Sequence, residues 1–310
     1  MTAIRMQGVR KEYGAHVVLD GIDLAVAAGE IFALLGPNGT GKTTTVGLLT
    51  TLIRPDAGTA VVAGCDVVRD SEAVRQRISL TGQSAAVDDA LTGVENLVMM
   101  ARLSGFRGRT ARARAEELLT SFDLAGAGTR RVSTYSGGMR RRLDLALSFV
   151  VRPQVLFLDE PTTGLDTRSR RDLWDVIRSL AAAGTTVFLT TQYLEEADVL
   201  ADRIAVLDSG RIVASGTPTQ LKTRLAGATV ELRDPHGALL HEIATDGTTA
   251  GVRAALDALG DAAGDIGIRR PTLDDVFLSL TAPASASASE PAPAPASAPT
   301  SSSQPIKEPA

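Results

Sequence analysis

The sequence is poor in the features that mark secreted, membrane-spanning and nucleic-acid-binding proteins. Among its 310 residues there is one cysteine, Cys65, which excludes an internal disulfide framework and fits a reducing compartment. No stretch approaches the roughly 18 uninterrupted apolar residues that a membrane helix requires, and the charged N-terminus, MTAIRMQGVRKEYG, lacks the apolar stretch of a signal peptide. The formal net charge of −4 creates no strong field toward nucleic acid. We therefore expect a chain that is neither secreted nor membrane-spanning by itself and has no nucleic-acid partner.

Apart from its C-terminus, the chain has the composition of an ordinary globular protein. Apolar residues make up 44% of it and charged residues 22%, and the length is enough for one large domain or two smaller ones. From about residue 282 the sequence becomes APASASASEPAPAPASAPTSSSQPIKEPA, which has no aromatic residue and no apolar period. Such a segment cannot bury enough apolar surface to offset its ordering entropy, so residues 282–310 are expected to be disordered.

Strands and helices alternate in the main part of the chain. The runs IFALL (31–35), VLFL (155–158) and TTVFLT (185–190) are short and continuously apolar, as in strands that are covered on both faces. Each precedes a helical segment, which predicts a parallel sheet with helices on both sides. The segment RIAVLDSGRIVAS (203–215) predicts a hairpin, and the alternation in VVLDGIDLAVAAGE (17–30) predicts a small antiparallel flank. The expected fold class is α/β, with a largely parallel core.

Two regions differ from this pattern. Residues 84–150 are expected to form a mostly helical subdomain, with Thr92 and Glu95 at the spacing of a capping box. After residue 219 the segments TVELRDPHGALLHEI, TTAGVRAALDAL and PTLDDVFLSL predict a hairpin, a helix and a last amphipathic helix. We therefore expect a main domain at 1–219 and a small α+β accessory domain at 220–281. The helical subdomain carries arginines that fit a solvated face, a docking surface being the alternative: Arg102, Arg107, Arg109, Arg112 and Arg114.

The segment GPNGTGKT, from Gly36 to Thr43, matches the eight-position loop that binds nucleotide phosphates. It follows the expected strand 31–35 and opens a helical run that is expected to continue until Pro55. Glycines let successive backbone N–H groups turn toward phosphate oxygens, and the start of the helix adds the positive end of its dipole. Lys42, one of four lysines in the chain, supplies a charge for the β- and γ-phosphates, and Thr43 offers a hydroxyl to Mg²⁺. The residues expected to bind the nucleotide here are Gly36, Pro37, Asn38, Gly39, Thr40, Gly41, Lys42, Thr43 and Thr44.

The run VLFLDEP (155–161) supplies two carboxylates at the end of a strand. Ligands of α/β sheets bind at the carboxyl ends of the strands. Asp159 is placed to hold Mg²⁺ directly or through water, and Glu160 to orient and deprotonate an attacking water. A strand that ends in Asp-Glu often only caps the next helix, but beside a phosphate loop the pair indicates nucleotide hydrolysis.

The segment YSGGMRRR predicts a second site for an anion. Ser136, Gly137 and Gly138 stand at the start of a helix expected at 139–151, where exposed N–H groups and the helix dipole favour negative charge. Since Lys42 already holds one nucleotide, either two ligands bind one chain or one ligand is held between two chains. The spacing of the residues leaves both arrangements open.

Over residues 3–218 the chain resembles an ATP-binding cassette (ABC) subunit, with every motif in the order of that family. GPNGTGKT corresponds to Walker A, VLFLDE to Walker B, YSGGM to the signature motif, and GLD, which ends at Asp166, to the D-loop. Tyr13 is placed like the aromatic residue that stacks on adenine, and Gln83 like the glutamine of the Q-loop. In this family the signature motif of one subunit closes over the ATP that the other subunit holds. The resemblance implies a head-to-tail homodimer that binds ATP and Mg²⁺ in two shared sites.

The segment VFLTTQYLEEAD places the uncharged Gln192 where the family normally has the histidine of the H-loop. That histidine reaches the γ-phosphate and couples it to the water and to Glu160. Glutamine cannot take up a proton, but its NH₂ group still donates a hydrogen bond. We expect Gln192 to keep the donor role and lose the titration, the alternative being a passive helix cap. The expected catalytic residues are Glu160, Gln192 and Lys42, and the expected metal ligands are Thr43, Gln83 and Asp159.

The segments TTQYLEEAD, MRRRLDLA and PTLDDVFLSLT further resemble the daunorubicin-resistance type of ABC subunit. Such a subunit lies on the cytoplasmic face of the cell membrane and powers a separate transmembrane permease that exports drugs or other hydrophobic compounds. The resemblance implies the same role here, with import as the alternative. A mechanical switch in translation or chromosome work would need tandem cassettes or a long coiled coil, and a kinase would leave YSGGM and GLD without a purpose. The accessory domain would steady the dimer, contact the permease or sense the state of the cell, and we favour the first.

Overall fold

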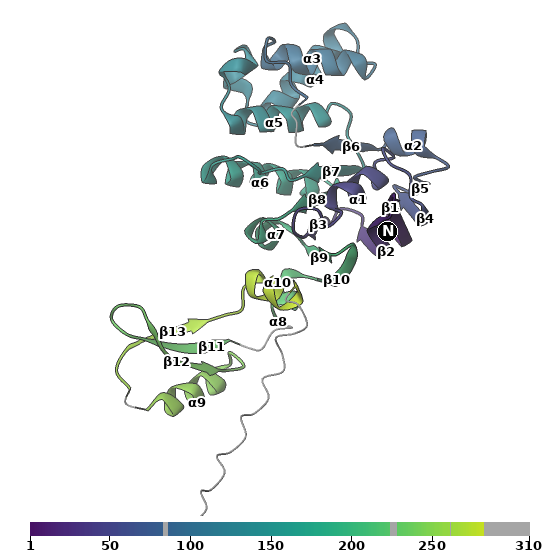
Figure 1. The fold of residues 1–310 in the computed structure, drawn as a ribbon. Helices are drawn as coiled ribbons and strands as arrows, with labels where there is room; N and C mark the ends of the chain where they lie inside the picture. The colour runs from purple at the N-terminus through teal and green to yellow at the C-terminus, as the bar shows by residue number, and fades with distance from the viewer. Residues whose placement is uncertain (83–85, 224–227, 261, 282–310) are drawn as a thin grey trace, which may run out of the picture.

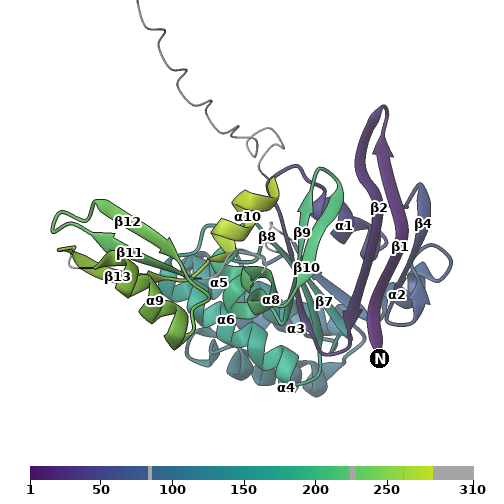
Figure 2. The same ribbon diagram turned by 90° about the horizontal axis from the view of Figure 1, so that it is seen from below.

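The computed structural model describes residues 1–82, 86–223, 228–260 and 262–281. An antiparallel sheet and a larger, mostly parallel sheet form the body of the molecule, with a helical arm on one side and a small α/β unit on the other (Figure 1). Seen from below, the N-terminal strands lie at the far end of the molecule from the small unit (Figure 2). The tail that was expected to be disordered, 282–310, lies outside the described residues.

The central sheet has the strand order β10-β9-β3-β8-β7-β6. Strand β8 (Thr186–Thr191) lies between β3 (Ile31–Leu35) and β7 (Val155–Asp159), and the three strands are parallel. Every residue in them is buried, which confirms strands covered on both faces. The other members are β6 (Ile78–Thr81), β9 (Arg203–Asp208) and β10 (Arg211–Gly216), the last two forming the predicted antiparallel hairpin. The carboxyl ends of β3, β8 and β7 therefore meet at one edge of the sheet.

Two cores form because successive residues of these strands point to opposite faces. Phe32, Phe157 and Phe188 face the N-terminal sheet, and the ring centroid of Phe188 lies 5.6 Å from each of the other two. Their neighbours Leu35 and Leu189 face the other way, into the core shared with the helices. Outside the arm, this core includes residues of α6 (Thr167–Ala182) and α7 (Leu194–Leu200), among other helices. Both faces of the sheet are thus covered, as the apolar runs predict.

The N-terminal sheet is antiparallel throughout and confirms the predicted flank. Its order is β2-β1-β4-β5, with β1 at Thr2–Tyr13, β2 at His16–Ala27, β4 at Ala57–Val62 and β5 at Cys65–Asp66. The short helix α2 (Ser71–Arg75) follows it in the chain. The sheet provides the wall against which the central phenylalanines pack.

Helix α1 (Lys42–Leu49) ends earlier than its sequence predicts. Thr51 has a φ of 66°, a left-handed conformation that a right-handed helix cannot include. The chain then turns back over Gly47, whose carbonyl accepts bonds from the N–H groups of Leu52 and Ile53. A Cβ on Gly47 would lie 2.7 Å from Cδ1 of Ile53. The expectation that this helix continues until Pro55 is therefore wrong, because the tight reversal over Gly47 replaces its last turn.

The helical arm consists of α3 (Gly93–Leu103), α4 (Gly108–Ser121) and α5 (Gly137–Ser148), which confirms a mostly helical region. The predicted capping box is present at the start of α3, where Thr92 and Glu95 exchange hydrogen bonds. Helix α5 occupies 137–148 rather than the expected 139–151. Within the described parts of the chain, no helix is long and apolar enough to span a membrane.

The arginines of the arm fall into two groups. Arg102, Arg107, Arg109 and Arg112 are exposed, as a solvated face requires. Arg114 instead donates to the carbonyl oxygens of Phe149 and Val150, at 2.6 and 3.1 Å. It therefore satisfies the carbonyl end of α5 and ties that helix to α4.

The small unit is a three-stranded antiparallel sheet with one helix. Its order is β12-β11-β13, with β11 at Thr229–Arg233, β12 at Leu239–Ala244, β13 at Asp265–Arg269 and α9 at Thr249–Leu259. The predicted hairpin and helix are both confirmed, whereas β13 was not anticipated. Val230 and Leu232 of the central strand are fully buried in this small unit.

The last helix, α10 (Leu273–Thr281), returns from the small unit to the main body. It contacts α7 and also α8 (Pro218–Thr223), the helix that precedes the small unit. Leu273 and Val276 are each 3% exposed and belong to the core that α6 and α7 share. Both chain segments that lead to and from the small unit are therefore anchored in the main body.

We expect Leu273→Ala to lower the free energy of unfolding by about 2–5 kcal/mol, because it leaves a cavity beneath α10. Leu278→Ala is the matched control, since Leu278 lies on the same helix and is 66% exposed. Urea unfolding followed by circular dichroism measures both. Equal midpoints for the two variants would contradict the docking of α10 on the main body.

Candidate nucleotide-binding site

The phosphate loop lies between the end of β3 and the start of α1. Gly36 admits no side chain, because a Cβ would collide with the carbonyl oxygen of Leu207. Gly39 and Gly41 have φ values of 83° and 106°, which side chains rarely adopt. Gly41 also occupies the N-cap of α1 and offers no side chain to cap it. The positive end of this helix is therefore left for an anion. The remaining expected residues of the loop lie in place around it: Pro37 and Thr40 half-buried, Asn38 exposed, and Thr44 half-buried.

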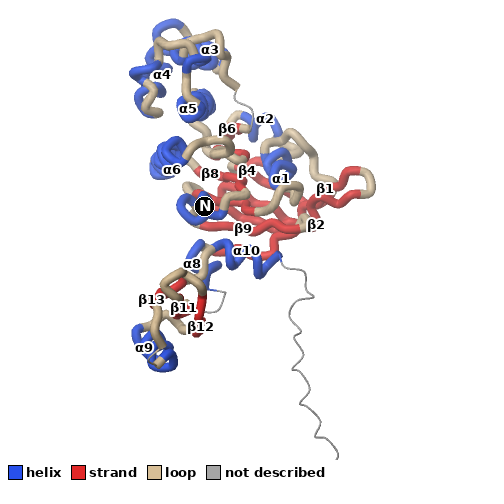
Figure 3. The backbone as a smooth tube through the Cα atoms, turned by 60° about the vertical axis from the view of Figure 1, so that its left-hand side comes forward, coloured by secondary structure: helices blue, strands red, loops and turns tan. Residues whose placement is uncertain are grey.

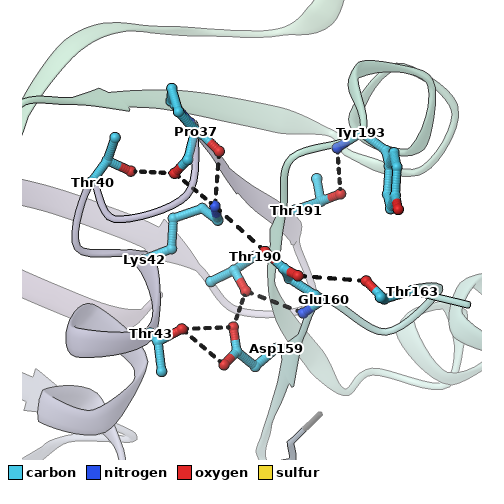
Figure 4. Close-up of polar contacts among 11 residues, drawn as sticks. Pro37, Thr40, Lys42, Thr43, Asp159, Glu160, Thr163, Thr190, Thr191 and Tyr193 are labelled. Atoms are coloured by element: carbon cyan, nitrogen blue, oxygen red, sulfur yellow. Dashed lines mark hydrogen bonds and ion pairs between the residues drawn. The ribbon is translucent and has the colours of Figure 1, made fainter.

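Lys42 reaches back over the loop (Figure 4). Its ammonium group donates to the carbonyl oxygens of Gly36 and Pro37 at 2.8 and 2.9 Å. Oε1 of Glu160 lies 3.5 Å away, and the two side chains are only 5% and 11% exposed. Burial lowers the pKa of Lys42, and the charge of Glu160 opposes this shift. The expected phosphate ligand and the expected catalytic base thus face each other across the same small space.

Asp159 joins three elements at this edge. Thr43, from α1, donates to Oδ2 of Asp159 at 3.1 Å, and Thr190, from β8, donates to its Oδ1. A hydroxyl beside a carboxylate is the oxygen donor set that Mg²⁺ prefers. Among the described residues, no three His, Cys, Asp or Glu side chains gather as a dedicated metal site. Mg²⁺ commonly binds through one or two protein oxygens and takes its other ligands from phosphates and water.

Glu160 is held in a conformation that few residues adopt. Its φ is 49°, in the left-handed region. Its N–H donates to the carbonyl oxygen of Thr190 at 3.1 Å, and Thr163 lies 3.5 Å from its carboxylate. With an extended backbone at residue 160 the chain would continue in the direction of β7. The left-handed turn instead brings the carboxylate of Glu160 to Lys42. Such strain persists where the surrounding contacts fix it, commonly at functional sites.

Gln192 follows β8 directly, between the phosphate loop and Glu160. Thr191, the last residue of β8, pairs with Leu35 on one side, and Thr190 pairs with Asp159 on the other. Gln192 is half-buried, and no hydrogen bond of its side chain to another described residue is present. The N-cap of the helix that follows, α7, is Tyr193 rather than Gln192, and no side chain of the described residues caps that helix. This favours the donor role over the passive cap.

The start of α5, which is the second expected anion-binding site, lies apart from the phosphate loop. Figures 1 and 3 show α5 with α3 and α4 in the arm, away from α1 in the main body. Ser136 caps α5 by accepting a bond from the N–H of Met139, and both Ser136 and Gly137 are exposed. Gly138 is buried, and a Cβ on it would collide with Ser169 of α6. A glycine at position 138 is therefore required for packing against α6 and also suits the binding of an anion.

Three further expected residues occupy the margins of the site. Tyr13 stands at the end of β1, 51% exposed, with Nζ of Lys11 lying 5.3 Å from its ring centroid. Asp166 is exposed and caps α6 by accepting a hydrogen bond from the N–H of Ser169 at 2.8 Å. This bond lowers the pKa of Asp166. Gln83 lies outside the described residues. The structure thus leaves Tyr13 and Asp166 accessible without bringing either into contact with Lys42.

Sequence reasoning missed the role of two threonines. Thr190 orients Asp159, and Thr163 lies beside the carboxylate of Glu160. A signal was present for the first, because a hydroxyl near the end of a mostly apolar strand, two residues before Gln192, has no reason in packing alone. No comparable signal marks Thr163, which a turn brings back to the strand end.

Known proteins are similar to this chain in sequence and in fold. A family model described as ABC transporter matches residues 19–163. Daunorubicin resistance ATP-binding protein DrrA3 of Streptomyces coeruleorubidus is 52% identical over 303 residues, covering 90% of this chain and 96% of the relative. Daunorubicin/doxorubicin resistance ATP-binding protein DrrA of Streptomyces peucetius is 58% identical over 231 residues, covering 74% and 70%. Nod factor export ATP-binding protein I of Paraburkholderia xenovorans is 39% identical over 297 residues, covering 90% and 97%.

Solved structures share the architecture at low sequence identity. An ATP-binding subunit of an ABC transporter superposes with a TM-score of 0.66 at 23% identity, covering 90% of this chain and 100% of that one. The ADP conformation of MJ1267, an ATP-binding cassette of an ABC transporter, gives 0.64 at 22% identity, covering 71% and 92%. At this identity the likeness shows the fold alone.

The fold and the phosphate loop together define a P-loop nucleotide hydrolase of the cassette class. The chain belongs to the ABC transporter family, in which it is an ATP-hydrolysing subunit coupled to transport. This confirms the fold class, the enzyme class and the family that the sequence predicts.

We expect Gln192→Ala to lower kcat for ATP by about 10²–10³, the usual loss when one preorganised donor is removed. The affinity for ATP should change little, because Lys42 and the phosphate loop remain. Steady-state hydrolysis and nucleotide titration separate the two effects. Hydrolysis at the parental rate would show that the side chain of Gln192 does not contribute to the reaction.

Gln192→His provides the matched comparison. Imidazole also donates a hydrogen bond but titrates near pH 6.5. The variant should keep most of the parental rate and gain a pH dependence between about pH 5.5 and 7.5 that the parent lacks. Identical pH profiles would exclude this position from the proton chemistry.

Proposed function

We propose that the chain powers export of drug-like or other hydrophobic compounds through a separate transmembrane permease, on the cytoplasmic face of the cell membrane. The relatives that cover nearly the same length are named for daunorubicin resistance or Nod factor export, which supports export over import. The observation that carries the ATPase part of the proposal is the meeting of Lys42, Asp159 and Glu160 at one sheet edge. Cargo contacts would lie in the permease.

The same edge supports hydrolysis by in-line attack of water on the γ-phosphate. A triphosphate in the loop would take over the ammonium of Lys42, which now bonds to two loop carbonyls. Glu160 would then be free of that ion pair and would orient and deprotonate the water. Thr43 and Asp159 would hold Mg²⁺, which neutralises charge on the phosphates when it is bound.

We further propose that two chains associate head to tail and share two ATP molecules. The exposed Ser136 and Gly137 support this, because they form the start of a helix that is distant from the loop of its own chain. The positive end of this helix faces solvent, where it would attract an anion brought by another molecule. Tyr13, Gln83 and Asp166 would complete the contacts of the nucleotide.

Dilution tests the shared site. The rate of ATP hydrolysis per chain should fall as the protein is diluted through the dissociation range of the dimer, and Lys42→Ala should abolish hydrolysis. Mixing Lys42→Ala chains with Ser136→Ala chains should restore at most one intact site per mixed dimer. A rate per chain that stays constant on dilution to the monomer would refute the head-to-tail arrangement.

The small unit is proposed to steady this dimer. Replacing residues 228–270 with a flexible Gly/Ser linker removes β11, β12, α9 and β13 but keeps the buried Leu273 and Val276 of α10. In a Glu160→Gln background, where ATP is bound but not hydrolysed, the deletion should weaken ATP-dependent dimerisation in size-exclusion chromatography. Unchanged dimerisation would instead favour a contact with the permease.

A further inference from the structure

Helix α5 carries a buried ion pair one turn after its exposed start. Nη1 of Arg141 lies 3.2 Å from Oδ2 of Asp144, and the side chains are 10% and 4% exposed. Burial lowers the pKa of Arg141 and raises that of Asp144. Taking two charges out of water commonly costs about as much as their attraction returns. Stability of α5 alone therefore gives no reason for the pair.

Atoms of the pair also bind the backbone of two loops, whereas Nη2 of Arg141 has no hydrogen-bond partner among the described residues. Nε of Arg141 donates to the carbonyl oxygen of Pro161 at 2.9 Å, and Nη1 donates to that of Gly82 at 2.7 Å. Oδ1 of Asp144 accepts a bond from the N–H of Ala86 at 2.8 Å. One ion pair thus binds two backbone carbonyls and one N–H that belong to segments far apart in the sequence.

Both loops leave the edge where the chemistry takes place. Gly82 follows the end of β6, and Pro161 follows Glu160 at the end of β7. The guanidinium is a flat group whose N–H directions are fixed, so it sets the separation of the two carbonyls and their direction from α5. The negative charges of Glu196 and Asp159 also act on the guanidinium, because they oppose the lowering of the pKa of Arg141 by burial.

We propose that Arg141 and Asp144 are positioning residues that make the loop behind Glu160 move together with the helix that presents Ser136. The inference rests on the proposed sharing of ATP between two chains. When Ser136 engages the nucleotide of the partner, the bonds to Pro161 and Gly82 carry that displacement to the catalytic edge of the same chain. Closure over one ATP would thereby set the geometry of the hydrolytic residues at the other.

The double variant Arg141→Met/Asp144→Leu tests this. It replaces a buried ion pair with apolar side chains of similar size, a change that is often neutral or stabilising. We expect the variant to stay folded at the assay temperature, although three backbone groups lose their partner, and the monomer's affinity for ATP to be preserved. We expect kcat to fall about 10- to 100-fold, because misplacement of a catalytic group by about 1 Å can cost up to the larger factor.

Two single variants show whether geometry rather than charge is responsible. Arg141→Lys keeps the positive charge but cannot hold two carbonyls in fixed directions, so it should lose most of the rate as well. Arg142→Met is the matched control on the same helix: it removes an arginine whose partner, Asp123, lies 2.9 Å away and is 91% exposed. The control should hydrolyse ATP at the parental rate.

Parental kcat in the double variant would overturn the inference. So would a loss of rate matched by an equal loss in Arg142→Met, or one explained by a fall in melting temperature. Failure of the proposed function gives a different result, because the parental chain itself would then hydrolyse ATP independently of dilution. If the parent passes the dilution test and the double variant equals it, the shared site stands and the positioning role does not.

Discussion

The bond between Thr190 and Asp159 joins β8 to β7 at the point where the sheet ends and the chemistry begins. The same carboxylate accepts a bond from Thr43 on α1. One side chain thus fixes the relative positions of the phosphate loop, the strand that carries Glu160 and the strand that leads to Gln192. Since β8 lies between the other two strands, a shift of any one of them would disturb all three groups at once.

The catalytic edge brings together charged side chains that are largely buried. Lys42 and Glu160 compensate each other in part, and backbone carbonyls of the loop supply the rest of the ammonium's partners. The left-handed φ of Glu160 adds local strain that two bonds from its N–H to Thr190 offset. When a triphosphate enters, the ammonium of Lys42 would exchange these acceptors for phosphate oxygens, and the carboxylate of Glu160 would become free to bind water.

The sequence predicts most of the site because its groups are local. Gly36 to Thr43 and the Asp159-Glu160 pair are short segments tied to strand ends, and the apolar runs place those ends at the same edge. The position of Gln192 gains a meaning only through family resemblance, since a lone amide has no chemical signature. Long-range contacts were out of reach: nothing in MRRRLDLA tells that Arg141 meets Gly82 and Pro161, and nothing around residue 265 pairs β13 with β11. The early end of α1 depends on a reversal over Gly47 that helix propensity does not reveal.

The small unit is an insertion between α8 and α10 rather than an appendage at one end. Lys222 of α8 bonds to Asp198 of α7, and α10 packs against α7 as well, so both tethers meet on the helix that begins just after Gln192. A unit attached at two nearby points can rotate about the line that joins them but is restricted in other directions. A force on the small unit is therefore transmitted to α7. A partner that binds the small unit would therefore act on α7, which begins close to Gln192, the residue that stands where the family normally has a histidine.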